Sequence, residues 1–325
     1  MSVIFLENAF QTASVNEVEG LIQRHNDLCA KSRKDPLNVD LRQAFKRVST
    51  QLGNCLPLIE VSADDQDVLM QLAGHDHVHS YGADSVEEIL RYRAGKRGES
   101  KQTFALVKPG QNGKDRQVLA AIYGHMDFVP DSNGKIHCSN LKGNVHDILT
   151  AEIHGVEQPN LATFYSVTAF EKRGVKGVAG LLINRLHAHL RQEMPSIKMI
   201  STLSPARGFG KWAKHSFLGE LRAFSEVDLQ RHILSYVPDF DAHSVAPDYA
   251  RNLHIKDNGA TLGWIHSKAN VQGSRDDVYG DGHIVPMVNY LYDLDGDTLE
   301  RQRIQNLSGN VGVHQDLIEH LRMAT

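Results

Sequence analysis

The chain has 325 residues, of which 41% are hydrophobic and 23% charged, as expected for a globular protein with one large domain or two modest ones. Its formal net charge of −4 argues against a general binder of nucleic acids or membrane surfaces, because both partners require a basic face. No stretch approaches the roughly 18 consecutive apolar residues of a membrane span. We therefore expect a cytoplasmic protein with no nucleic-acid or membrane partner.

The first 95 residues are predicted to be helical. Ser14 and Glu17 form a capping box ahead of apolar residues at helical spacing. A second apolar stripe ends at Gly53, which is expected to stop that helix. A third helix is predicted over Asp65–Leu72, and a further capping box begins at Ser85. We place a helical region at residues 1–95 and a mixed domain at residues 96–325.

After this region the pattern favours strands. Phe104–Lys108 and Val118–Tyr123 are predicted to form a hairpin across a turn rich in Gly, Pro and Asn. A strong helix begins at Val178 and ends before Pro195, and a second helical stretch covers Ala213–Tyr236. Further strands are predicted at Ala162–Thr168, Ile197–Leu203, Ala260–Ile265 and Met287–Tyr292. This order favours an α+β fold over a doubly wound sheet, whose strands and helices alternate regularly.

A glycine-rich turn separates the strand at Ala162–Thr168 from the helix that begins at Val178. Backbone amides at a helix N-terminus favour a pyrophosphate, and Lys172, Arg173 and Lys176 add positive charge nearby. The glycine spacing is not interpreted as a dinucleotide fingerprint, because the surrounding βαβ unit and its acidic residue are missing. The alternative is a tight turn that only allows close helix packing.

Two further residues have side chains suited to catalysis. Ser204 lies at the end of a predicted strand, directly before Pro205. Ligands of open sheets bind at such strand ends, although a polar strand end without a ligand is the simpler interpretation. His254 precedes a turn and can transfer a proton near neutral pH.

The sequence suggests no metal site. The cysteines, Cys29, Cys55 and Cys138, are odd in number and widely spaced, which argues against a disulfide framework and a thiolate site. A reducing compartment is expected. The histidines at positions 75, 77 and 79 resemble a metal cluster but lack a further ligand set, and we interpret them as an exposed loop.

Four segments in the same order resemble the malonyl-CoA decarboxylase family. They read FYSVTAFEKRGVKGVAGLLINRL, STLSPARGFGKW, ARNLHIKDNGATLGWI and MVNYLY, and they lie between about residues 100 and 295. The resemblance implies a GNAT-like fold that binds an acyl-CoA. It also implies decarboxylation of malonyl-CoA in fatty acid metabolism, without a cofactor, since coenzyme A is part of the substrate.

The family's site residues fall on definite positions of this chain. Its Ser-His pair matches Ser204 and His254, and its tyrosine matches Tyr292 beside Asn289. Ser204 is expected to orient the leaving carboxylate and His254 to act as general acid, with Tyr292 and Asn289 as lesser candidates for the enolate oxygen. The coenzyme-binding turn matches Lys176, Gly177, Val178, Ala179, Gly180 and Leu181.

Three other functions share the same coenzyme site. They are a GNAT-type acyltransferase, a decarboxylase of acyl groups on a carrier protein, and a non-catalytic acyl-CoA-binding regulator. The helical N-terminal region fits either a cap on the core or the surface of a homo-oligomer.

Overall fold

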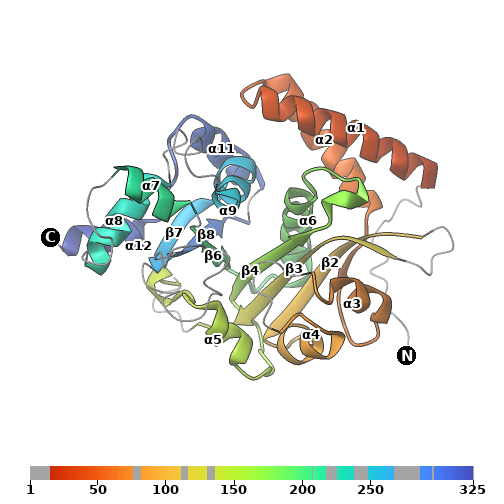
Figure 1. Ribbon diagram of the computed structural model, residues 1–325, viewed down its shortest axis with the longest axis horizontal. Coiled ribbons are helices and arrows are strands. Elements are labelled where there is room, and N and C mark those ends of the chain that lie inside the picture. The colour runs from red at the N-terminus through yellow and green to blue at the C-terminus, as the bar shows by residue number, and fades with distance from the viewer. Residues whose placement is uncertain are drawn as a thin grey trace.

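The computed structural model describes residues 15–75, 82–110, 116–129, 136–206, 208–216, 225–237, 248–266, 286–294 and 296–324. Ser14, two of the three histidines in the 75–79 cluster and most of the turn after Lys108 lie outside the described residues. A central sheet is flanked by helices on both faces, with a separate group of helices around its far end (Figure 1).

The sheet is mixed and has eight strands. Their order is β1-β2-β3-β4-β5-β8-β6, and β7 pairs with β8 off this path. The strands are β1 (Leu58–Glu60), β2 (Lys101–Lys108), β3 (Gln117–Asp127), β4 (Leu161–Ala169), β5 (Met199–Thr202), β6 (Ser204–Pro205), β7 (Thr261–His266) and β8 (Met287–Tyr292). The predicted hairpin is confirmed, because β2 and β3 pair antiparallel.

β4 and β5 form a parallel pair within this otherwise antiparallel sheet. Their register runs from Leu161 opposite Met199 to Phe164 opposite Thr202, and the amide of Leu203 donates a last bond of 2.7 Å to the Phe164 carbonyl. The chain then turns toward β8, with which the two residues of β6 pair. β4 continues to Ala169, whereas β5 ends at Thr202, so the two strands part there, and residues of both line a cavity.

The helices are α1 (Val15–Lys34), α2 (Val39–Cys55), α3 (Gln66–Leu72), α4 (Val86–Tyr92), α5 (Val145–Thr150), α6 (Val178–Glu193), α7 (Phe209–Ser216), α8 (Glu226–Tyr236), α9 (Tyr249–Arg251), α11 (Gly296–Leu307) and α12 (Gln315–Met323). Short 3₁₀ turns occupy Cys138–Asn140 and Glu171–Arg173, and a π-helix occupies Asn252–Asp257. Among the described helices, none has the length and apolar character needed to span a bilayer.

α6 forms the crossover between the parallel strands. Its apolar residues at helical spacing, including Leu182, Leu186 and Leu190, are fully buried against the sheet face that carries Phe104 and Phe164. Truncating one such leucine to alanine typically costs about 2–5 kcal/mol of stability. The helix ends at Glu193, just before Pro195, as predicted.

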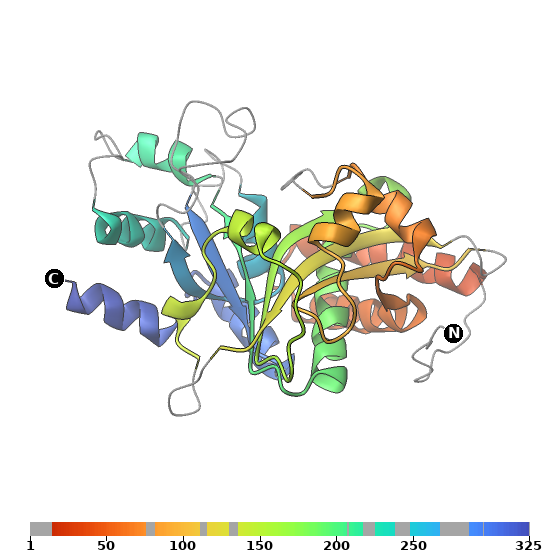
Figure 2. The same cartoon turned by 90° about the horizontal axis from the view of Figure 1, so that it is seen from below.

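Different helices pack on the two faces of the sheet (Figure 2). α1, α2 and α6 lie on one side, and α3 and α4 lie on the other. Alternation along β2 explains this division, because Phe104 and Leu106 belong to the core under α6, whereas Ala105 and Val107 pack with α3 and α4. The mixed sheet and the N-terminal helices confirm the predicted α+β class.

Some element boundaries were wrong. α2 continues past Gly53 to Cys55, because Leu52 and Leu56 are both fully buried and keep the chain helical to that point. The long helical stretch expected up to Tyr236 contains two helices, α7 and α8, and residues 217–224 between them lie outside the described residues.

The region before residue 96 is not purely helical. Its strand β1 pairs antiparallel with β2, with Leu58 opposite Leu106 and Glu60 opposite Phe104. The N-terminal region therefore contributes the first strand of the central sheet. The division into 1–95 and 96–325 stays a prediction.

Candidate active site

Ser204 and His254 are 50 positions apart in the sequence and meet in the fold. Ser204 Oγ and His254 Nε2 are joined by a hydrogen bond of 3.0 Å. Ser204 is held by β6, where it pairs with Val288 of β8, and His254 lies in the π-helix that follows α9. In Figure 1, α9, β6 and β8 lie together beside β4. The structure thus brings together the hydroxyl and the imidazole that the sequence pattern singled out.

The segment that carries His254 has a defined beginning and end. Asp248 caps α9, and its carboxylate accepts bonds from the Arg251 amide (2.9 Å) and the Tyr236 hydroxyl (3.0 Å). The chain leaves the π-helix through Gly259, whose φ of 70° lies in the left-handed region. A Cβ at this position would lie 2.2 Å from the Leu299 carbonyl oxygen, so glycine is required. π-Helical turns are rare in proteins, and many of those that exist lie at functional sites.

Asn306 on α11 stabilises the same segment through hydrogen bonds to its backbone. Its side chain is fully buried, and its amide group donates bonds of 2.9 Å to the carbonyls of Ile255 and Ala260. The Ala260 amide in turn donates 2.9 Å to the His254 carbonyl. Asn306 therefore fixes the backbone around His254 from a separate helix. The sequence pattern gave no signal for this residue.

Tyr292 bonds to the other ring nitrogen of His254. Its hydroxyl lies 2.6 Å from His254 Nδ1, while Tyr290 stacks on the same imidazole at 5.0 Å between ring centroids. Burial lowers the pKa of His254 to about 3 and raises the pKa of Tyr292 well above its usual value. The imidazole is therefore neutral and the phenol protonated at pH 7. Tyr292 is placed to orient His254 from the side opposite Ser204.

His187 on α6 extends this aromatic group. Its ring meets Tyr292 edge-on, with 4.7 Å between centroids, and burial lowers its pKa to about 4. The coenzyme helix predicted from the sequence is thereby packed against the residue that holds His254.

A cavity of about 170 Å³ opens at Ser204 and His254. It lies where β4 and β5 diverge, since Phe164, Val167 and Thr202 form its walls. The other residues that line it are Tyr165, Ser166, Pro205, Tyr249, Ala250 and Leu253. Most of this lining is apolar, so a small acyl group fits better here than a highly polar one. Tyr249, which is 78% exposed, stands at the cavity's edge.

The side chain of Asn289 makes its hydrogen bonds within the sheet. Its amide group donates to the Thr202 carbonyl (2.9 Å) and to Ser201 Oγ (3.2 Å), and its oxygen bonds to His266 Nε2 at 2.7 Å. These contacts tie β8 to β5 and β7. Among the described residues no hydrogen bond joins Asn289 to Ser204 or His254, so the structure does not bring it to the pair.

The predicted coenzyme turn lies at the start of α6. Gly177 is the N-cap in the left-handed conformation (φ 66°), and its carbonyl accepts bonds from the amides of Gly180 and Leu181. Lys176 is exposed. Arg173 does not point its charge at the turn, because its guanidinium donates to Gln71 Oε1 and to a carbonyl of β3.

The turn does not line the described cavity, but it contacts the histidine segment. A Cβ on Gly180 would lie 3.3 Å from Asn258 Oδ1, and Asn258 Nδ2 donates to the Leu253 carbonyl at 2.6 Å. Leu253 lines the cavity beside His254. One asparagine therefore links the first turn of α6 to the wall of the cavity.

Helix α1 holds the turn from outside, which the sequence pattern did not reveal. His25 Nε2 bonds to the Lys176 carbonyl at 3.0 Å, and Asn26 bonds to the Lys176 amide and the Gly174 carbonyl. Arg33 Nη2 lies 4.0 Å from the position that a Cβ on Gly177 would take. The N-terminal helix thus adds both backbone support and a positive charge.

Comparison with known proteins identifies relatives of this chain. Residues 135–254 match the family model "Malonyl-CoA decarboxylase C-terminal domain". The mitochondrial malonyl-CoA decarboxylase of Anser anser anser is 31% identical over 100 residues, which make up 28% of this chain and 20% of that protein. The match thus spans about a fifth of the curated relative. The resemblance to the malonyl-CoA decarboxylase family is confirmed over this region.

Solved structures extend the likeness to the fold. A crystal structure of malonyl-CoA decarboxylase from Cupriavidus metallidurans superposes with a TM-score of 0.56 at 20% identity, over 92% of this chain and 76% of that one. The loading GNATL domain of CurA from Lyngbya majuscula gives a TM-score of 0.43 at 15% identity, over 74% of this chain and 98% of the domain. The first of these likenesses, together with the diverging parallel strands, confirms the expected fold.

Proposed function

We propose that this chain is a carboxy-lyase of the malonyl-CoA decarboxylase type, which converts malonyl-CoA to acetyl-CoA and CO₂. The observation that carries the proposal is the Ser204–His254 hydrogen bond at the wall of a largely apolar cavity. The matched region, residues 135–254, contains both residues and the start of α6.

In the proposed mechanism, the thioester lies in the opening between β4 and β5, with its free carboxylate at Ser204. The serine hydroxyl donates to this carboxylate and holds it out of the plane of the thioester carbonyl. The bond from the α-carbon to the carboxylate can then break, and its electron pair passes into the thioester as an enolate. Preorganised donors at such an oxygen are typically worth about 3–4 kcal/mol each.

The enolate needs a proton at its α-carbon, and His254 supplies it through the Ser204 hydroxyl. In the empty site the imidazole is neutral, because burial lowers its pKa to about 3. A carboxylate that binds within a few ångströms favours the charged imidazole, so substrate binding draws one proton from solvent onto His254. Ser204 passes its hydroxyl proton to the carbon and takes one back from Nε2. The cycle consumes one proton and leaves both residues as they began.

Tyr292 serves this cycle by orienting His254. When the imidazole is protonated, Nδ1–H donates to the Tyr292 oxygen, and Nε2–H remains directed at Ser204. General acid catalysis of this kind typically contributes about 10²–10⁴-fold to the rate. Asn289 has both ends of its amide engaged within the sheet, so we assign it to sheet geometry rather than to the enolate oxygen.

We further propose that the coenzyme's pyrophosphate binds at Lys176–Leu181. The first turn of a helix presents amides and the positive end of its dipole, which favour this anion. The exposed Lys176 and the nearby Arg33 add positive charge. Asn258 connects this turn with the cavity wall.

The decisive experiment supplies malonyl-CoA alone and follows CO₂ and acetyl-CoA. The proposal predicts both products without an added acceptor, metal or cofactor. Turnover only with acetyl-CoA and an amine would instead identify an acyltransferase, and turnover only with a malonylated carrier protein would identify that substrate. Binding without turnover would identify a regulator.

Substitutions then test the assigned roles. Ser204→Ala and His254→Ala are expected to lower kcat by about 10²–10⁴-fold while the proteins stay folded. Ser235→Ala on the exposed face of α8 and His146→Gln on α5 are matched controls, expected to keep normal activity. Folded Ser204→Ala and His254→Ala proteins with full CO₂ release would refute the mechanism.

Location and pathway are also proposals. None of the three cysteines, all within the described residues, forms a disulfide, which supports a reducing compartment such as the cytoplasm. Removal of malonyl-CoA supports a role in fatty acid metabolism. A homo-oligomer stays a prediction that light scattering of the purified chain would test.

A further inference from the structure

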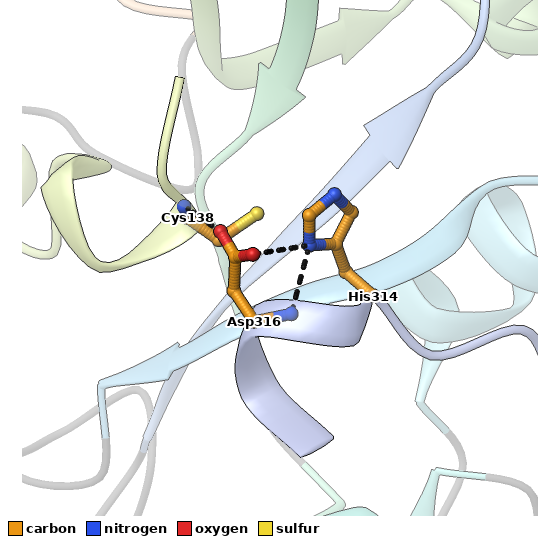
Figure 3. Close-up of side chains that lie close together, drawn as sticks. All are labelled: Cys138, His314 and Asp316. Carbon is orange, nitrogen blue, oxygen red and sulfur yellow. Dashed lines mark hydrogen bonds and ion pairs between the residues drawn. The ribbon is translucent and has the colours of Figure 1, made fainter. Parts of the chain in front are cut away.

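A second cluster of reactive side chains lies apart from the Ser204 pair. Cys138, His314 and Asp316 converge between the loop after β3 and the start of α12 (Figure 3). Their potential ligand atoms, a sulfur, a ring nitrogen and a carboxylate oxygen, all lie within 4.8 Å of one another. Cys138 and Asp316 are 178 positions apart in the sequence. The fold therefore gathers three metal-ligating groups of different types at one point.

The side chains of His314 and His137 lie near the Asp316 carboxylate at distances close to those between ligands of one ion. His314 Nδ1 lies 3.7 Å from one Asp316 oxygen, and His137 Nδ1 lies 3.6 Å from the other. Direct N–H···O bonds are shorter, at about 2.7–3.2 Å. Nitrogen and oxygen ligands about 2.0–2.2 Å from a tetrahedral zinc ion are about 3.3–3.5 Å apart. His137 thus lies at the same carboxylate, outside the set of three ligand atoms.

The surroundings suit a held cation. Cys138 is fully buried, and its neighbours in the local core are apolar, among them Ile136, Leu141 and Leu291. Its own amide donates to Asp316 Oδ2 at 2.8 Å, which fixes the orientation of the carboxylate. Partners of this kind commonly orient metal ligands.

The hydrogen bond between the Asp316 amide and His314 Nδ1 must break when a cation binds. His314 Nδ1 accepts a long bond of 3.3 Å from the Asp316 amide, as the cap of α12. A cation in the cluster would take this lone pair, and the amide at the helix start would turn to water or to a carboxylate oxygen. The thiol must also lose its proton, so binding releases about one proton per ion near neutral pH.

We propose that Cys138, His314 and Asp316 form a binding site for a zinc-like divalent cation, with water in the fourth position. One thiolate, one imidazole and one carboxylate match the ligand preferences of zinc rather than those of magnesium or calcium. The site shares no residue with the Ser204–His254 pair or with the cavity beside it. Because its ligands come from two separate segments, a bound cation would fasten α12 to the loop at 136–141.

Cobalt provides the direct test, because a cobalt–thiolate bond gives a charge-transfer band in the near ultraviolet. Untagged full-length protein is stripped with a chelator, dialysed and titrated with Co²⁺. We expect the band to saturate at one ion per chain and to disappear when Zn²⁺ is added. Zn²⁺ alone should raise the Tm of the stripped protein. Absence of a band and of any Tm shift in the wild-type protein would overturn the proposal.

Variants locate the site. Cys138→Ser should lose the band and lower the affinity for Co²⁺ by about 100-fold or more, whereas Cys55→Ser, at a half-buried cysteine on α2, should keep both. His314→Gln should weaken binding without removing the thiolate band at saturating Co²⁺. Circular dichroism verifies that each variant is folded. Equal binding by Cys138→Ser and the wild-type protein would assign the cobalt elsewhere and refute the site. Decarboxylation is not a readout here, so the metal site and the proposed function are tested separately.

Discussion

Asn26 on α1 holds the backbone at Lys176, the first residue of the predicted coenzyme turn. Its side-chain oxygen accepts a 2.8 Å bond from the Lys176 amide, and its nitrogen donates 2.7 Å to the Gly174 carbonyl. One amide side chain thereby fixes the backbone on both sides of Val175, directly before the lysine, from a helix about 150 residues earlier in the chain. The N-terminal helix is therefore part of the structure that shapes the turn.

This relationship predicts that Asn26→Ala weakens acyl-CoA binding. Losing hydrogen bonds worth about 1 kcal/mol should raise the KM for malonyl-CoA by about 5- to 10-fold and leave kcat nearly unchanged. Steady-state kinetics measures the split. Gln23→Ala, on the exposed face of the same helix, is the control and should behave like the wild type. An unchanged KM in Asn26→Ala would separate α1 from coenzyme binding.

Tyr292→Phe removes only the hydroxyl that bonds to His254 Nδ1. The imidazolium loses a buried charge-assisted partner, worth about 1.5–3 kcal/mol, so kcat should fall by roughly 10- to 100-fold. The KM should change little, and the pH profile of kcat should shift toward acid, because protonated His254 is less well stabilised. Tyr92→Phe, outside the site, controls for the loss of a phenol. A normal pH profile in Tyr292→Phe would contradict the orienting role.

Asn306→Ala leaves two buried carbonyls, those of Ile255 and Ala260, without their donor. We expect the free energy of unfolding to fall by about 2–4 kcal/mol, measured by urea denaturation. Activity should fall even where the protein is folded, because the backbone around His254 is released. Asn310→Ala, at an exposed position, should change neither quantity. A stable but inactive Asn306→Asp protein would separate the effect on His254 from the effect on folding.

Buried histidines make the stability of the fold depend on pH. The pKa of His187 falls from 6.5 in the unfolded chain to about 4 in the folded protein because of burial. A depressed folded pKa means that the unfolded chain binds the proton first. The stabilisation is therefore complete above pH 6.5 and is lost as the pH falls toward 4, at up to about 1.4 kcal/mol per pH unit.

His187→Leu tests this linkage. The variant should show a shallower decline of the unfolding free energy between pH 6.5 and 4 than the wild type. Urea denaturation at four or five pH values measures the slope. The His146→Gln variant, at an exposed histidine, should keep the wild-type slope. If the unfolding free energy of His187→Leu and of the wild-type protein declined with the same slope, another group would be responsible for the pH dependence.

Local patterns predicted most of the elements from the sequence. The apolar spacing along α6, the β-branched and aromatic residues of β4 and the turn before β7 are each encoded within a few residues. The same holds for the pairing of β2 with β3, which needs only a short connection. Gly53 misled the prediction because burial of Leu52 and Leu56 outweighs a local stop signal.

The site was predictable only in part. Ser204 and His254 stand in recognisable segments, and the fold brings them together as those segments suggest. Asn26 and Asn306 carry no local signal, because each acts on the backbone of a segment far away in the sequence. The cluster of Cys138 with Asp316 was missed for the same reason. Ligand spacing in the sequence reveals a metal site only when the ligands come from neighbouring turns.

The pairing of β1 with β2 determines which truncated fragments of the protein can fold. A fragment that starts at residue 96 would lack the outermost strand, so the amides and carbonyls of β2 at Phe104–Leu106 would face solvent as an open edge. Such an edge recruits strands from other molecules, and the fragment would aggregate rather than fold as an independent enzyme. Expression trials for catalytic studies therefore need to retain Leu58–Glu60.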